Sequence, residues 1–297
     1  MAGQPVEAPR PVRVSGVDAG GRTRAGELRF LAMVVGAGLG GLIAWSNPHR
    51  VAGTEFTLFA VLALMLGTAS GEVFGYGLAR WRDVLTSHPT VRFRHCIPAL
   101  LGVAAVAGLL IGAAPFVVGR ELIPERSLTL ASLALFGALP AAGALSAVQR
   151  AVQAPLPGTP GAQLDGLLTL RRLLSSLLNQ LGLLILLVML ANGAATQWGT
   201  DLPTTVVIFS GTVSSLIVGA AFVPAASTLR RRSSYFVDQY FTLDDAPLAE
   251  LIQRADDRIK LEKMLGIDRT TFDDFKAGLV ILAPILASAV AAVIANL

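Results

Sequence analysis

The stretch FTLFAVLALMLGTASGEVFGYGL, Phe56 to Leu78, decides the fold class because it is long and apolar enough to cross a bilayer as one helix. A helix rises about 1.5 Å per residue, so about 20 apolar residues span a hydrocarbon core of ~30 Å. The stretch carries one acidic residue, Glu72, and glycines at four-residue spacing. It predicts a membrane-spanning helix that packs against a neighbouring helix.

The composition of the whole chain agrees with this prediction. Of 297 residues, 53% are hydrophobic and 15% are charged, and the mean hydropathy is +0.63. Soluble domains have about 25% charged residues. We therefore expect an all-α integral membrane protein, a polytopic helical bundle of about seven transmembrane helices. The expected spans are Phe30–Ser46, Phe56–Leu78, Ile97–Val118, Leu128–Val148, Leu173–Ala194, Leu202–Val223 and Ala277–Leu297.

The positions of the charged and aromatic residues predict an orientation. Lysine and arginine collect in cytoplasmic loops, and tryptophan collects where a span meets the headgroups. If the N-terminus is cytoplasmic, 21 of the 24 basic residues lie inside; the three outside are Arg50, Arg120 and Arg126. The tryptophans fall at predicted span ends: Trp45, Trp81 and Trp198. We expect a cytoplasmic N-terminus and a C-terminus outside.

Four regions follow from this pattern. They are a disordered basic cytoplasmic tail (1–28), a six-helix membrane bundle (29–229), a cytoplasmic amphipathic helical insert (230–276) and a seventh transmembrane helix (277–297). The tail lacks the apolar core of a secretory signal. The strong preference for arginine over lysine is typical of a GC-rich bacterial genome, so we expect a multi-pass protein of the plasma (inner) membrane.

The glycines of VVGAGLGGLIAW, Val34 to Trp45, admit two interpretations. Gly36, Gly38 and Gly41 match a dinucleotide-binding loop, but Pro48 ends any following helix and no acidic residue lies at the required distance. We therefore expect no cofactor, and instead close helix packing at small residues spaced by four. The predicted packing positions are Gly36, Gly40, Gly67, Gly71, Gly75, Gly108, Gly112, Gly211, Ser215 and Gly219. An Ala- and Gly-rich composition alone also produces such spacings.

Glu72 is the only acidic residue deep inside a predicted span. It lies eight residues, or about 12 Å, from Arg80 at the cytoplasmic end, and Asn179 and Gln180 lie at a similar depth from Arg172. A carboxylate in a span costs roughly 2.5–3.5 kcal/mol and needs a partner or a proton. We expect a hydrogen-bonded cluster of Glu72 with the two amides. It is either structural or a proton or cation site.

No catalytic or metal site is predicted. The three histidines, His49, His88 and His95, fall in loops or at span ends, where no serine–histidine pair can form within a span. His95 and Cys96 could be two metal ligands, but no third ligand lies nearby. Phosphate-binding and metalloprotease motifs do not occur in the sequence. We therefore do not expect an enzyme.

The connection between the sixth and seventh predicted spans is rich in interaction features. It opens with Arg230, Arg231 and Arg232, which could bind anionic lipid headgroups or only fix the orientation. A helix follows, with Asp245 and Pro247 at its start and Gly266 at its end. Its apolar stripe predicts contact with lipid, with the bundle or with a partner, and then shifts to Leu261 and Leu265. The stripe consists of Leu248, Leu251, Ile252, Ala255 and Ile259.

Two functions remain compatible with these patterns. The first is a non-catalytic membrane component whose insert docks a protein partner or mediates self-assembly into a homo-oligomer. The second is a small transporter or channel that uses Glu72. The spans are poor in transport chemistry, so the first is favoured. Nucleic acid is not expected as a partner, because orientation in the membrane explains the basic residues.

Overall fold

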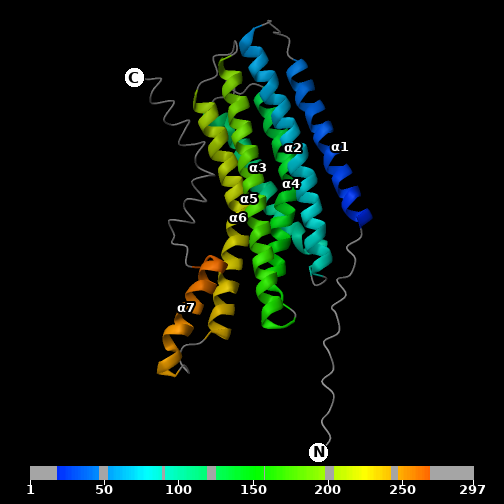
Figure 1. Ribbon diagram of the computed structural model, residues 1–297. Coiled ribbons are helices and arrows are strands. Elements are labelled where there is room, and N and C mark those ends of the chain that lie inside the picture. The colour runs from blue at the N-terminus through cyan, green and yellow to red at the C-terminus, as the bar shows by residue number, and fades with distance from the viewer. Residues whose placement is uncertain are drawn as a thin grey trace, which may run out of the picture.

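The computed structural model describes residues 19–46, 53–88, 91–118, 125–156, 158–197, 204–241 and 247–267. Within these ranges the chain forms α-helices and no strand (Figure 1). The helices are α1 (Ala19–Trp45), α2 (Thr54–Ser87), α3 (Phe93–Val118), α4 (Glu125–Gln153), α5 (Pro160–Gln197), α6 (Thr204–Tyr240) and α7 (Leu248–Leu265).

Six of these helices are long and apolar enough to cross a membrane, which confirms the predicted fold class. Their apolar parts overlap the first six predicted spans, with ends that differ by up to 17 residues. They are Gly26–Trp45, Phe56–Ser87, Phe93–Ala113, Leu128–Gln153, Pro160–Ala194 and Phe209–Tyr240. The seventh predicted span, Ala277–Leu297, lies outside the described residues.

The six long helices run side by side as a bundle, and α7 lies beside one end of α6 (Figure 1). The centre of the bundle is α4, where every residue from Ala141 to Val148 is buried. Small side chains make this possible: Gly143 faces the Trp81 ring of α2, and Ala141 faces Gly77 of the same helix. The large buried side chains around α4 come chiefly from α2 and α5.

Two predicted boundaries differ from the structure for the same physical reason. Helix α6 has 37 residues, so it is about 55 Å long and exceeds the ~30 Å hydrocarbon core. It continues through Arg230, Arg231 and Arg232 to Tyr240, where the sequence predicted the start of a separate insert. Similarly, α1 begins at Ala19, inside the predicted disordered tail. Hydropathy marks where the apolar surface ends, whereas a helix continues as long as its backbone hydrogen bonds do.

Glycine brings α1 and α2 into direct backbone contact. A Cβ on Gly71 would lie 2.9 Å from the Cα of Met33, and one on Gly36 would lie 3.0 Å from the carbonyl carbon of Gly67. Carbon atoms normally approach to about 3.5–4.0 Å. Any side chain at these positions would therefore force the two helices apart, and this close contact sets the geometry of the polar groups near the N-terminal end of α1.

Candidate functional site

An ion pair between Arg29 of α1 and Glu72 of α2 lies at the predicted cytoplasmic end of the glycine contact. The guanidinium reaches both carboxylate oxygens: Nε donates to Oε2 at 2.7 Å, and Nη2 donates to Oε1. This is the bidentate geometry that makes arginine–carboxylate pairs strong. The Glu72 side chain is 18% exposed and the Arg29 side chain 43% exposed. Gly75 allows this approach, because a Cβ there would lie 3.0 Å from the Cα of Arg29.

Tyr76 extends the ion pair into a small network. The Arg29 guanidinium lies 5.3 Å from the centre of the Tyr76 ring, and the Arg80 guanidinium lies 5.1 Å from it. Both distances are within the range of cation–π attraction. The Tyr76 hydroxyl hydrogen-bonds with the Ser176 hydroxyl of α5. The network therefore joins α1, α2 and α5 at one level of the bundle.

The expected cluster of Glu72 with Asn179 and Gln180 is wrong. Among the described residues, Arg29 occupies both oxygens of Glu72, and no hydrogen bond joins Glu72 to either amide. Asn179 is exposed and Gln180 is half-buried on α5. Similar depth on two helices is not enough, because the α5 residue that faces this part of α2 is Ser176, one turn earlier. The sequence interpretation missed Arg29 because that residue lies one position before the first predicted span, Phe30–Ser46, and was counted with the cytoplasmic charges.

The predicted packing positions fall into two groups. Gly36, Gly40, Gly67, Gly71 and Gly75 all lie in the α1–α2 contact. Gly211 lies against the Met189 side chain of α5, and Ser215 is buried. The expected close contact is not found for three glycines: no atom of the described neighbours lies within 4 Å of a Cβ placed on Gly108, Gly112 or Gly219. Composition is sufficient to explain those three spacings.

Arg258 fixes α7 to the end of α6. Its guanidinium donates to the Asp238 carboxylate at 2.7 Å, to the Phe241 carbonyl at 3.3 Å and to Glu262 at 2.9 Å. The pKa of Arg258 is raised above its usual value, first by the hydrogen bond to Glu262 and then by that to Asp238. The guanidinium stays charged at any working pH, so the attachment does not depend on its titration.

The C-terminal end of α7 makes the remaining contacts with the bundle. Arg171 of α5 donates to the Met264 carbonyl, and Leu261 and Leu265 are buried. Gly266 ends the helix in the left-handed conformation with φ 66°, as its position predicted. Arg230 donates to the Ile267 carbonyl at 3.4 Å, so this arginine binds another part of the same chain. Arg231 is exposed, and Arg232 lies over the Tyr235 ring.

The apolar stripe predicted on α7 is not the side that packs. Ile252 is 78% exposed and Ile259 is 59% exposed, whereas the buried side chains are the shifted pair that follows the stripe. Leu251 is also exposed, and the Leu248 side chain lies outside the described residues. Only the last turns of α7 reach the bundle. The stripe therefore has no partner within the described part of the chain.

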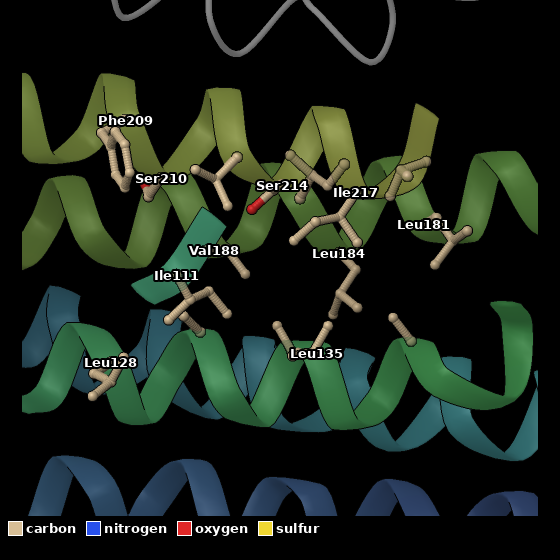
Figure 2. A pocket seen from close by; sticks show the side chains of 16 residues that line it. Ile111, Leu128, Leu135, Leu181, Leu184, Val188, Phe209, Ser210, Ser214 and Ile217 are labelled. Atoms are coloured by element: carbon tan, nitrogen blue, oxygen red, sulfur yellow. The ribbon is translucent and has the colours of Figure 1, made fainter. Parts of the chain in front are cut away.

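An apolar pocket lies between α4, α5 and α6 inside the membrane-spanning part (Figure 2). The volume of the pocket is about 130 Å³. Its sixteen lining residues include two polar ones, Ser210 and Ser214. The others are Ile111, Leu128, Ala131, Ala134, Leu135, Ala138, Leu181, Leu184, Ile185, Val188, Phe209, Val213, Ile217 and Val218.

Three sites have been described: the Arg29–Glu72 network, the attachment of α7 to the bundle, and the apolar pocket. Their contacts are ion pairs, hydrogen bonds and apolar packing. Within the described residues no group of three or more histidine, cysteine, aspartate or glutamate side chains is placed to hold a metal ion. Comparisons with protein-family models, with characterised proteins and with solved structures find no match to this chain. Its function has to be argued from the geometry of these three places.

Proposed function

We propose that this chain is a non-catalytic component of the plasma membrane whose cytoplasmic helix α7 docks one helix of a protein partner. The observation that carries this proposal is the exposed stripe on a helix whose other end is attached by directional hydrogen bonds. Ile252 and Ile259 are exposed, while Arg258 and Arg171 hold the helix at the bundle. A fixed helix with an exposed apolar side has the form of a docking surface.

The spacing of the stripe favours a helix as the occupant. Leu248, Ile252, Ala255 and Ile259 follow one another at intervals of four, three and four residues. This is the a/d spacing at which two helices pack with knobs into holes. Asp256 and Lys263 flank the stripe with charges of both signs, which suits another protein helix better than an anionic lipid surface.

The small size of the stripe favours a separate partner over a standing dimer of this chain. A stable interface of standard size uses about 20–30 residues on each side. The a/d positions of the stripe offer four side chains over about three turns, which is enough for a transient or regulated contact. Anionic headgroups are a secondary expected neighbour at Arg231, where each basic residue near the surface contributes ~1 kcal/mol.

The alternative, a transporter with a proton or cation site at Glu72, gains no support from the geometry. A site for a mobile ion needs free carboxylate oxygens, and Arg29 occupies both. The pair also explains how a carboxylate is tolerated in a span without any transport function.

The test combines copurification with site-specific cross-linking from intact membranes. A photoreactive amino acid at Ala255, in the stripe, is compared with one at Gln253, which is exposed on the opposite side. Ile252→Glu with Ile259→Glu disrupts the stripe, and Gln253→Glu with Lys260→Glu adds the same residue type elsewhere on the same helix. These are surface changes, so we expect folding to be unaffected within about 0.5 kcal/mol.

We expect one protein to cross-link from Ala255 but not from Gln253, to copurify with the chain through that cross-link, and to be lost only with the Ile252 and Ile259 substitutions. A cross-link from Ala255 to α7 of a second copy of this chain would overturn the proposal of a separate partner and show self-assembly through the stripe. Equal cross-linking from both positions, or copurification that ignores the stripe, would overturn the proposal.

A further inference from the structure

The pocket between α4, α5 and α6 has the length of one leaflet. Its wall on α4 runs from Leu128 to Ala138 and its wall on α6 from Phe209 to Val218, each about 15 Å along the helix. The hydrocarbon core is ~30 Å thick, so one leaflet is about 15 Å deep. Both walls begin near the helix N-terminal ends, so the pocket occupies the half of the bundle that the charge pattern predicts to be outside.

The few polar groups lie toward the membrane surface and the apolar ones lie deeper. Asn192 of α5 is 2% exposed, and its Nδ2 donates to the Ser210 hydroxyl at 3.4 Å, near the predicted outer end. Ser214 lies one turn deeper, and its hydroxyl points into the pocket (Figure 2). Beyond it the walls are aliphatic, with Leu181 and Leu184 on one side and Ile217 on the other.

The pocket is continuous with the surface that faces lipid. Leu128 lines it and is 46% exposed, whereas Leu184 and Ile185 at its depth are buried. Water gains nothing from entering so apolar a space, because a buried water needs two to four polar partners. An empty space would leave its aliphatic walls without dispersion contacts. A flexible hydrocarbon chain, already concentrated at the mouth, meets both conditions.

We propose that this pocket binds the hydrocarbon chain of a membrane lipid, inserted from the leaflet at the N-terminal ends of α4 and α6. The aliphatic walls contact the chain, and the Ser210–Asn192 pair lies where the polar linkage of such a lipid enters. Binding here is non-covalent. The site is separate from α7, so it stands independently of the docking function.

The experiment uses the full chain in membranes whose lipids carry a photoreactive, clickable acyl chain. Irradiation precedes purification, and mass spectrometry maps each adduct to its residue. The adduct mass distinguishes an intact phospholipid from a free fatty acid. The wild-type map is decisive by itself: adducts on Leu184 or Ile185 report a chain inside the pocket, because both side chains are buried.

Filling the pocket provides the second readout. Ala131→Phe with Ala138→Phe fills it from α4, and Ser214→Phe fills it from α6 if the first variant fails to fold. Ala105→Phe on α3 is the matched control, since Ala105 is exposed and does not line the pocket. We expect the filled variants to lose pocket adducts at least about tenfold, equivalent to 1.4 kcal/mol, while the control retains them.

Three results would overturn the proposal. The first is a wild-type map with adducts on exposed positions such as Leu183 and none on the buried ones. The second is a pocket signal that the filling substitutions leave unchanged. The third is a cross-link from the pocket to residues 277–297 of the same chain in place of lipid, which would make that segment the occupant.

Discussion

Gly71→Ala tests whether α1 and α2 are in backbone contact, and Gly38→Ala is its matched control. The new methyl at residue 71 would lie 2.5 Å from the Ala32 carbonyl carbon and closer still to its oxygen, so the helices must separate by about 1 Å or more to reach an ordinary carbon contact. At residue 38 of α1 no atom lies within 4 Å of the same methyl. Both substitutions bring the same gain in helix propensity, about 1 kcal/mol at most.

The difference between the two variants therefore isolates the packing term. Overpacking costs typically 1–3 kcal/mol, and a gap of even 0.5–1 Å forfeits a quarter to a half of each dispersion contact along the seam. Water cannot offset this loss, because in lipid the helices associate through packing and hydrogen bonds rather than the hydrophobic effect. We expect Gly71→Ala to be about 2 kcal/mol less stable than Gly38→Ala.

The assay measures the apparent melting temperature of the purified protein in mild detergent. Melting is monitored as the loss of monodisperse protein with temperature. About 2 kcal/mol corresponds to a difference of roughly 4–8 °C for a chain of this size. Unfolding in detergent can be irreversible, so both variants are heated at one scan rate. If they melt together, the helices do not approach at residue 71, and the position of Arg29 over Glu72 loses its structural basis.

Three further outcomes follow from the described contacts. Arg258→Ala should weaken the attachment of α7 by about 1 kcal/mol and leave the melting temperature unchanged. Proteolysis of the chain beside α7 should then be about fivefold faster. Arg254→Ala removes one exposed ion pair and should leave the proteolysis rate unchanged. Tyr76→Phe and Ser176→Ala should each cost about 1 kcal/mol of stability, and the double variant no more than either, since they share one hydrogen bond. Glu72→Gln should lower the melting temperature and leave proton flux into liposomes at background; flux that the wild type shows and this variant lacks would favour a transporter.

Local hydropathy was sufficient to predict the first six spans because a bilayer imposes the same requirement on every segment. About 20 apolar residues must follow one another whatever they pack against. Gly266 was predicted correctly as the end of α7 for a similar reason, since the left-handed conformation at a helix end is a local preference. Helix ends outside the apolar region, such as that of α6 at Tyr240, lack this constraint and were missed.

The partner of Glu72 depends on how two helices align, which hydropathy does not encode. The glycine spacing nevertheless held a usable signal. In the structure Gly40 faces Ala63, Gly36 faces Gly67 and Gly71 faces Ala32, so each turn forward on α1 matches a turn back on α2. One more turn along this antiparallel seam reaches Arg29. The glycine spacing on the two helices, aligned as an antiparallel seam, therefore predicts Arg29 beside the Glu72 carboxylate.

The packing side of α7 and the pocket could not be predicted in this way. Periodicity identifies an apolar side of a helix but not which turns reach a neighbour, and α7 meets the bundle only near Leu261 and Leu265. The pocket needs walls from separate helices, and each wall alone reads as an ordinary apolar segment. Its two serines are common in membrane helices and carry no signal until they face the same space.

The distribution of satisfied and unsatisfied groups separates the candidate functions better than any single residue. In the described bundle, three pairs of polar side chains hold one another: Glu72 with Arg29, Tyr76 with Ser176, and Asn192 with Ser210. A transport pathway requires such groups to be open to a moving ion. The open surfaces described above are apolar: the pocket between α4, α5 and α6, and the stripe on α7. Exposed apolar surfaces bind apolar partners, whereas ion transport requires polar groups that are accessible to the ion. The arrangement therefore favours a protein that binds lipid and a partner over one that transports ions.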